Sequence, residues 1–442
     1  MASWLGRIRR INAHNASTFR RAPLAEISGS LGDLGTLLPL MISLAIQRSV
    51  SLGSTLVFSG IFNILTGVVF GIPLPVQPMK AIASAALSSQ QDSSIGVVMA
   101  AGQWVGAAVL LMSATGLLTW ATAVVPIPVV KGIQLGAGLS LITGAGSSLL
   151  QPLDWIHPVL DNKLWSLLAF LVLIVTQRLP KFPYALLFFA VSIVFAFITI
   201  ASSQRSLPGL HVWTPRFVLP EWVGLAVPGF PALSMAVGQL PLTTLNSVIA
   251  VSALASDLLP DVPTPSVTSI GFSVALMNLT GTWFGTMPLC HGAGGLAAQY
   301  RFGARSGASV IFLGSVKVVL GLAFGETLIE LLQSYPKSIL GIMVLAAGLE
   351  LAKVGHTLNK GASDLWEGSA GARRPRALRD DERLERWTVM LMTAAGILVF
   401  KNDAVGFSAG MLCHAAYKLA DWVSRRGRDR ASQGERGPLL GC

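Results

Sequence analysis

The chain has 442 residues and a formal net charge of +11, with 52% apolar and only 12% charged residues. Water-soluble domains carry about 25% charged residues, so this composition excludes a soluble globular protein. The basic residues gather at the two ends and in a few loops rather than along one face interleaved with aromatic residues, which argues against nucleic-acid binding.

Apolar segments follow one another along most of the chain and predict an all-α polytopic membrane protein. A membrane-spanning helix needs about 20 mostly apolar residues. The fourteen expected elements are residues 24–47, 52–71, 78–90, 94–120, 126–146, 163–178, 184–201, 229–255, 266–285, 292–302, 307–325, 336–352, 387–400 and 403–422. The elements 78–90 and 292–302 are too short to span and are expected to be half-helices.

The distribution of Lys and Arg predicts the orientation in the membrane. Basic residues are frequent in the N-terminal tail 1–21, the polar loop 353–386 and the C-terminal tail 426–442. An even number of crossings places these segments on one side, and the positive-inside rule makes that side cytosolic. We therefore expect both termini in the cytosol, with residues 202–228 connecting two halves of the chain.

An internal repeat relates those two halves, residues 22–201 and 229–425. Matching stretches occur in the same order and at similar spacing: 32–34 with 238–240, 65–71 with 279–285, and Gly132-Ile133 with Gly341-Ile342. Seven elements separate equivalent positions, and an odd number inverts the second copy in the membrane. Inverted repeats with short broken helices at matching positions are typical of secondary transporters.

Each repeat contains a break that directly precedes its half-helix. Residues 75–80 hold two prolines, and residues 290–295 hold three glycines. Non-helical backbone inside a membrane persists only when it is buried in protein or lines a wet cavity. A helix N-terminus carries about half a positive charge and free N–H groups, and inversion aims two such ends at each other. The sequence thus predicts an anion site, with Lys80 adding a charge and His291 a donor.

The first and eighth elements supply the expected walls of this site. Polar side chains in apolar segments are costly and mark functional positions. Thr36 comes from the first element, and Gln239 and Thr243 come from the eighth. The full set of predicted substrate-binding residues is Gln77, Met79, Lys80, Thr36, Gln239, Thr243, His291, Gly292, Ala293, Gly294 and Gly295.

Several charged residues also lie in apolar segments. A carboxylate beside an anion site is unfavourable unless it is protonated, so Asp33 is a candidate for proton coupling, with a structural ion pair as the alternative. Lys131, Lys317 and Glu350 are expected to have structural or interfacial roles.

Enzyme functions fit this sequence poorly. Residues 406–410 match the nucleophile elbow of hydrolases, and residues 291–295 are similar to an esterase oxyanion loop. The elbow requires a preceding strand of a sheet, which this hydropathy does not predict. No second intramembrane aspartate with a suitable motif accompanies Asp33 for an aspartyl protease. We expect no enzyme, no cofactor and no metal site.

Three stretches resemble the molybdate transporter family, distant relatives of the sulfate permeases. These stretches are residues 26–39, 73–80 and 290–305, and the resemblance extends over about 22–425. It implies a molybdate importer or vacuolar exporter with a seven-plus-seven inverted-repeat fold. In that fold a core of elements 1–4 and 8–11 moves against a gate of elements 5–7 and 12–14.

Several alternatives stay open at this point. Molybdate and sulfate share charge and shape, so a sulfate transporter is the nearest alternative, although the short polar stretch after the last element favours the molybdate branch. An anion channel is the alternative of a different class. The sequence leaves the coupling ion, the direction of transport, plasma membrane versus vacuolar membrane, and a homodimer undecided.

Overall fold

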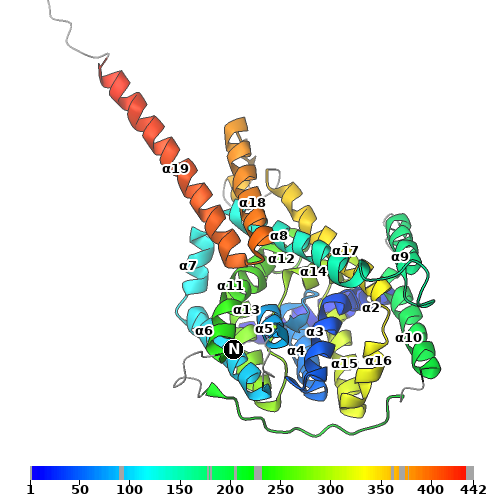
Figure 1. The fold of residues 1–442 in the computed structure, drawn as a ribbon. Helices are drawn as coiled ribbons and strands as arrows, with labels where there is room; N and C mark the ends of the chain where they lie inside the picture. The colour runs from blue at the N-terminus through cyan, green and yellow to red at the C-terminus, as the bar shows by residue number, and fades with distance from the viewer. Residues whose placement is uncertain are drawn as a thin grey trace, which may run out of the picture.

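The computed structural model describes residues 2–88, 94–176, 179, 182–203, 207–222, 231–359, 363–367, 374–376 and 378–434. Within these residues, helices make up nearly all of the regular structure, and four very short strands complete it. Figure 1 shows the helices gathered in one bundle, from which the ends of α18 and α19 project.

The first half of the chain runs from a surface helix to the end of α10. Its elements are α1 (Ala2–Arg21), α2 (Pro23–Ser30), α3 (Leu34–Ile46), α4 (Leu52–Phe70), β1 (Val76–Pro78), α5 (Lys80–Ser88), α6 (Ile95–Ala114), α7 (Leu117–Val124), α8 (Ile127–Ala145), which continues as a π-helical turn (Gly146–Leu150), α9 (Lys163–Thr176) and α10 (Tyr184–Ser202).

The second half repeats much of this order. Its elements are α11 (Pro231–Leu242), a π-helical stretch (Thr243–Ala250), α12 (Val251–Leu258), α13 (Val267–Gly281), β2 (Leu289–His291), α14 (Ala293–Arg301), α15 (Ala308–Ala323), α16 (Ile329–Gln333), α17 (Lys337–Ala352), β3 (Trp366–Glu367), β4 (Arg374–Pro375), α18 (Asp380–Phe400) and α19 (Asp403–Gly434).

Every one of the fourteen expected segments overlaps a helix. Among the described residues, six helices are long and apolar enough to cross a membrane, and the bent pair of 308–323 with 325–333 makes a seventh. The chain is therefore a helical membrane protein, while the number of crossings stays a prediction.

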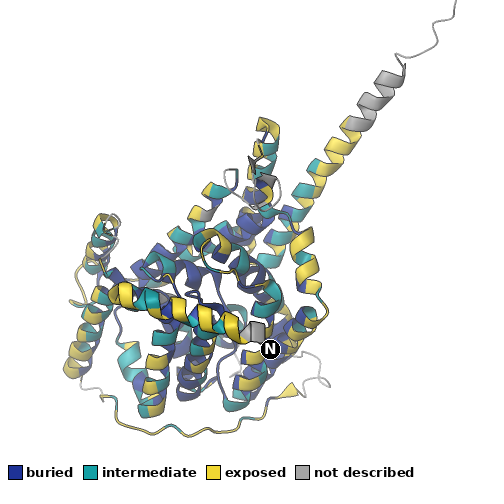
Figure 2. Ribbon diagram, turned by 180° about the vertical axis from the view of Figure 1, so that it is seen from behind, coloured by how far each residue is buried: buried dark blue, intermediate teal, exposed yellow. Residues whose placement is uncertain are grey.

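Several expected boundaries differ from the structure. The first expected element is interrupted between α2 and α3, and α18 begins at Asp380, inside the expected loop 353–386. The expected N-terminal tail forms helix α1, which lies across the outside of the bundle (Figure 2). Asn15 fastens this helix, because its Nδ2 donates to Gly67 O and its Oδ1 accepts from Gly307 N–H, both at 2.9 Å. The expected C-terminal tail 426–442 begins inside α19, and residues 435–442 lie outside the described residues.

Local sequence explains where several helices begin and end. Ser51, Ser94 and Ser266 precede α4, α6 and α13, and each side chain accepts a hydrogen bond from the N–H three residues later. Gly71 and Gly285 are the last residues of the matched stretches of the two repeats, with φ angles of 71° and 73°. Glycine adopts this left-handed conformation without steric cost, and it ends α4 in the first repeat and the 3-10 turn Thr282–Phe284 after α13 in the second.

Glycines allow close helix contacts within the core and within the gate. A Cβ on Gly60 of α4 would lie 2.7 Å from Gly314 O of α15, in the core. A Cβ on Gly138 of α8 would lie 2.7 Å from Gly348 O of α17, in the gate, and the reverse distance is the same. Small residues let helix backbones approach closely within a membrane, where packing drives association.

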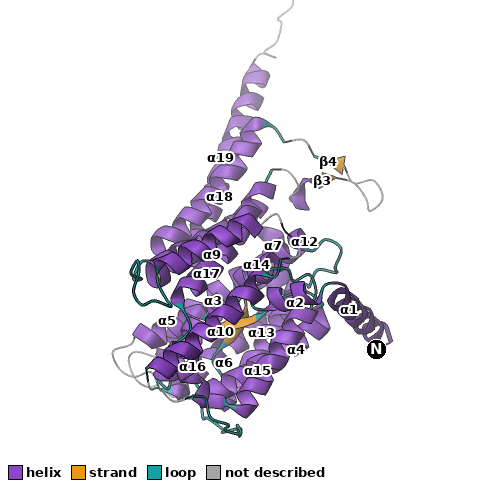
Figure 3. Ribbon diagram, turned by 90° about the vertical axis from the view of Figure 1, so that its right-hand side faces the viewer, coloured by secondary structure: helices purple, strands orange, loops and turns teal. Residues whose placement is uncertain are grey.

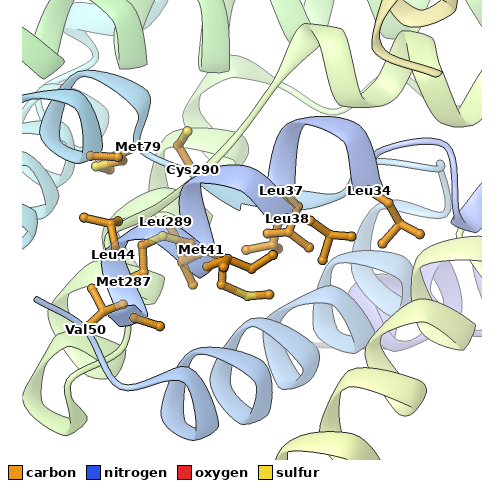
Figure 4. Close-up of a cluster of buried hydrophobic side chains, with 14 of the residues drawn as sticks. Leu34, Leu37, Leu38, Met41, Leu44, Val50, Met79, Met287, Leu289 and Cys290 are labelled. Atoms are coloured by element: carbon orange, nitrogen blue, oxygen red, sulfur yellow. The ribbon is translucent and has the colours of Figure 1, made fainter. Parts of the chain in front are cut away.

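Helix α3 forms the apolar support beneath the strands. Leu34, Leu37, Leu38, Met41 and Leu44 of α3 belong to one buried cluster. Figure 4 shows them beside side chains from both breaks, Met79 and Cys290. The first element is thus packed against the two half-helix units, whose position it helps to define.

Candidate functional site

The two predicted breaks meet inside the bundle. Strand β1 pairs antiparallel with strand β2, so that Val76 lies opposite His291 and Pro78 opposite Leu289. Figure 3 shows this strand pair surrounded by helices. The pairing satisfies backbone groups that would otherwise be buried without partners. It also brings the starts of α5 and α14 to one region of the molecule.

An asparagine from the preceding helix holds each strand. Asn63 Oδ1 accepts from Val76 N–H at 2.8 Å, and Asn278 Oδ1 accepts from Leu289 N–H at 2.9 Å. Both asparagines are buried. The sequence analysis did not single them out, although each lies close to one of the matched stretches, and that symmetry was the signal available.

The N-terminus of α5 carries Lys80 and a hydrogen bond from the eighth element. Lys80 is the first residue of α5 and is half-buried. Gln239 Oε1 accepts from Ala81 N–H at 2.8 Å, and Gln239 Nε2 donates to Thr243 Oγ1 at 2.9 Å. One free N–H of the first turn of α5 therefore already has a protein acceptor.

The N-terminus of α14 is covered by Gln77. A Cβ on Gly292, the N-cap of α14, would overlap Gln77 Oε1, and a Cβ on Gly295 would lie 2.5 Å from Gln77 Nε2. The carboxamide of Gln77 donates to Asp33 Oδ1. Glycine at these positions thus makes room for a side chain that Asp33 orients.

His291 is buried with protein partners at both ring nitrogens. Its Nε2 lies 3.0 Å from Ser273 Oγ, and its Nδ1 lies 3.3 Å from Pro75 O. The ring therefore links α13 to the first break. In this arrangement it contributes to holding the strands together.

The other predicted residues lie in differing surroundings. Met79 and Ala293 are buried within apolar clusters. A Cβ on Gly294 would lie 2.8 Å from Leu141 of α8, so the start of α14 directly faces the gate. The side chain of Thr36 lies outside the described residues.

A cavity of about 480 Å³ lies between core and gate at the start of α5. The core contributes residues at the start of α5 and near the π-helical stretch, and the gate contributes α8 and the junction of α18 with α19. The lining residues are Lys80, Leu242, Asn246, Ala137, Ser140, Leu141, Thr143, Gly144, Ser147, Ile397, Leu398, Lys401 and Asp403. Lys80 is the one predicted substrate-binding residue among these lining residues.

The gate side of this cavity is what sequence reasoning missed. Ser140 and Thr143 of α8 and Ser147 of the π-helical turn that continues it recur at helical spacing and line the cavity. Lys401 ends α18 in the left-handed conformation, with φ of 49°, and Asp403 begins α19. A non-glycine residue in that conformation is costly and marks a position worth functional attention.

Core and gate are joined by an ion pair toward the other end of α8. Lys131 of α8 is buried and donates to the carboxylate of Asp257 on α12, and it also donates to Thr357 Oγ1 at 3.0 Å. Lys131 precedes the cavity residue Ala137 by about 9 Å along the helix axis. The cavity and this ion pair thus lie at different depths of the same interface.

The remaining intramembrane charges have differing partners. Glu350 pairs with Lys353 at 3.0 Å, in agreement with the expected structural or interfacial role. Lys317 of α15 is buried, and its Nζ donates no hydrogen bond to any residue that the structure describes. The opposite charge that acts on it is Asp33.

Inverted repeats, paired half-helices and a cavity between core and gate are the features of a secondary-transporter fold. The transmembrane domain of a cyanobacterium bicarbonate transporter, BicA, aligns with a TM-score of 0.51 and 15% identity, over 88% of this chain and 97% of that domain. At this identity the likeness concerns the fold alone.

Sequence comparison identifies the family. A family described as "Molybdate transporter of MFS superfamily" matches residues 25–141 and 231–351, which fall on equivalent parts of the two repeats. Molybdate transporter 2 of Arabidopsis thaliana is 35% identical, covering 89% of this chain and 87% of that protein. Molybdate transporter 1 of the same plant is also 35% identical, covering 93% and 91%. The chain belongs to the molybdate transporter family.

Proposed function

We propose that this chain is a secondary active transporter of molybdate, which binds the oxyanion in the cavity at the start of α5. The observation that carries the proposal is the position of Lys80, the first residue of a half-helix, on the wall of a cavity between core and gate. The names of the relatives supply the substrate. The sequence predicts a site between two half-helix N-termini. We place the anion at the start of α5 alone, because Gln77 covers the start of α14.

The chemistry of the cavity suits a divalent tetrahedral oxyanion. The N-terminal dipole of α5 and the Lys80 ammonium provide positive charge, and four substrate oxygens need hydrogen-bond donors. The hydroxyl group of Ser140 and the carboxamide of Asn246 line the same space. Thr143 also lines it, but its hydroxyl donates to Leu139 O at 3.0 Å and would have to turn to meet the anion. A cavity of about 480 Å³ leaves room for water around one such ion. Closer contact then requires movement of the core against the gate, as a carrier makes.

The proposal predicts that Lys80→Ala weakens molybdate binding more than it affects folding. A bound dianion that loses a charged partner at the start of a helix loses typically a few kcal/mol, so the dissociation constant should rise roughly a hundredfold. Titration of the purified variant with molybdate measures this, and its thermal stability reports folding. Lys353→Ala is the matched control, because Lys353 forms an exposed ion pair with Glu350. Unchanged affinity in Lys80→Ala would place Lys80 outside the site.

Sulfate transport is the nearest alternative function, since the two anions share charge and shape. Competition between the two anions in the purified protein distinguishes the two functions: a molybdate transporter should hold molybdate against a large excess of sulfate.

We further propose that both termini face the cytosol, because the basic segments lie together on one side in a fourteen-crossing arrangement. A fluorescent reporter on either terminus tests the orientation. The plasma membrane and the vacuolar membrane are both compatible with it.

A further inference from the structure

Asp403 is a gate carboxyl in the same cavity as Lys80. It is the first residue of α19 and lines the cavity between core and gate. Its buried Oδ2 accepts no hydrogen bond from any residue that the structure describes. Burying a carboxylate oxygen without a partner is costly, so this group is poised to meet a proton or a cation.

The charged groups near Asp403 come from two other elements. Lys80 of α5 attracts Asp403 across the boundary between core and gate. Lys401 lies at the end of α18 and lines the same cavity. Helix α19 also packs against α8 and α11. The cavity-lining residues of α8 are uncharged, its Lys131 is paired with Asp257, and α11 contains no charged residue. Lys80 is therefore the cation whose charge acts on Asp403, and Lys401 lines the same cavity. The charged residues of α18, which packs most extensively against α19, lie at Asp380–Arg386, at least about 20 Å along that helix from its end at Phe400.

This geometry sets up a competition for Lys80. In an empty cavity the charged carboxylate of Asp403 balances Lys80. A divalent oxyanion at Lys80 adds two negative charges beside that carboxylate. These charges make the ionised form of Asp403 less favourable. A proton on Asp403 removes the repulsion and frees Lys80 for the substrate. Proton and anion would then each favour the binding of the other, which is the thermodynamic basis of symport.

We propose that Asp403 is a proton-binding residue of the substrate cavity, which competes with the oxyanion for Lys80 when charged and admits the oxyanion when protonated. This inference rests on the proposed function and names the group through which protons act on it. It differs from the prediction for Asp33. Asp33 belongs to the core, accepts a hydrogen bond from Gln77 and does not line this cavity.

The test compares molybdate affinity at about pH 6 and about pH 8 in the purified full-length protein. For the native chain we expect tighter binding at the lower pH. Asp403→Asn, which cannot become charged, should bind at the higher pH roughly tenfold more tightly than the native chain and lose most of its pH dependence. Asp403→Glu should retain the pH dependence. Asp421→Asn, a change on the exposed far part of α19, is the matched control and should behave as the native chain does.

Two results would overturn the proposal. One is native affinity and native pH dependence in Asp403→Asn. The other is loss of binding at both pH values in Asp403→Asn with normal thermal stability, which would make Asp403 a direct support of the anion rather than its competitor. A native chain that binds neither molybdate nor sulfate would instead refute the proposed function, so the two failures are distinguishable.

Discussion

At the scale of single residues, two carboxamides occupy the ends of the half-helices where the sequence predicted an anion. Gln239 accepts a hydrogen bond from an N–H of α5. Gln77 lies over the start of α14 and donates a hydrogen bond to Asp33. Both glutamines were predicted to contact substrate. The structure instead shows each in contact with protein groups, so each has to give up or share these contacts if it also binds the anion.

Asp33 accepts the hydrogen bond that orients Gln77, and the sequence predicts that Asp33 takes part in proton coupling. We propose that protonation of Asp33 changes its hydrogen bond to Gln77 and thereby the region around the anion site. Asp33→Asn keeps the shape and is expected to retain molybdate binding while losing the rise of uptake at acid pH, measured by radiotracer uptake into proteoliposomes. Full pH-driven accumulation in this variant would leave Asp33 with a structural role only.

At the scale of elements, contacts between core and gate determine what can move. The core is fastened internally by the glycine contact between α4 and α15, and the gate by the contact between α8 and α17. Close-packed backbones of this kind have few alternative arrangements and move as units. The ion pair of Lys131 with Asp257 joins α8 of the gate to α12 of the core, so a rigid-body displacement must break or rebuild it.

We therefore predict that this ion pair controls the transport cycle. Lys131→Ala leaves the Asp257 carboxylate without its partner and should lower the initial rate of uptake roughly tenfold. The exchange Lys131→Asp with Asp257→Lys should recover part of that rate, because the pair forms again with reversed polarity. The coupling between the two residues is measured by radiotracer uptake in the single variants Lys131→Asp and Asp257→Lys and in the double variant. If the double variant takes up molybdate no faster than either single variant, the ion pair does not control the transport cycle.

At the scale of the whole molecule, we propose that the arrangement works as a carrier. The cavity lies between two bodies, and the same interface is held together farther along α8. Access through such an interface requires the bodies to rearrange once per cycle. An open channel would instead require a continuous wet path.

This arrangement predicts accumulation of molybdate against its gradient. Proteoliposomes containing the native chain should concentrate radiolabelled molybdate when the outside is more acidic than the inside, and a protonophore should abolish the accumulation. Liposomes without protein are the control for leakage. Uptake that stops at equal concentrations under the same pH gradient would favour the channel reading.

Composition and local sequence determined the membrane class, the positions of the helices, the inverted repeat and the two breaks. These features follow from apolar content, proline and glycine, which act on the chain within a few residues. The tertiary structure decided which side chains share a cavity. Lys80 and Asp403 are more than 300 residues apart in the chain, and only the packing of the gate on the core brings them together. The direction of a side chain depends on how its helix is rotated against its neighbours, which no local pattern specifies.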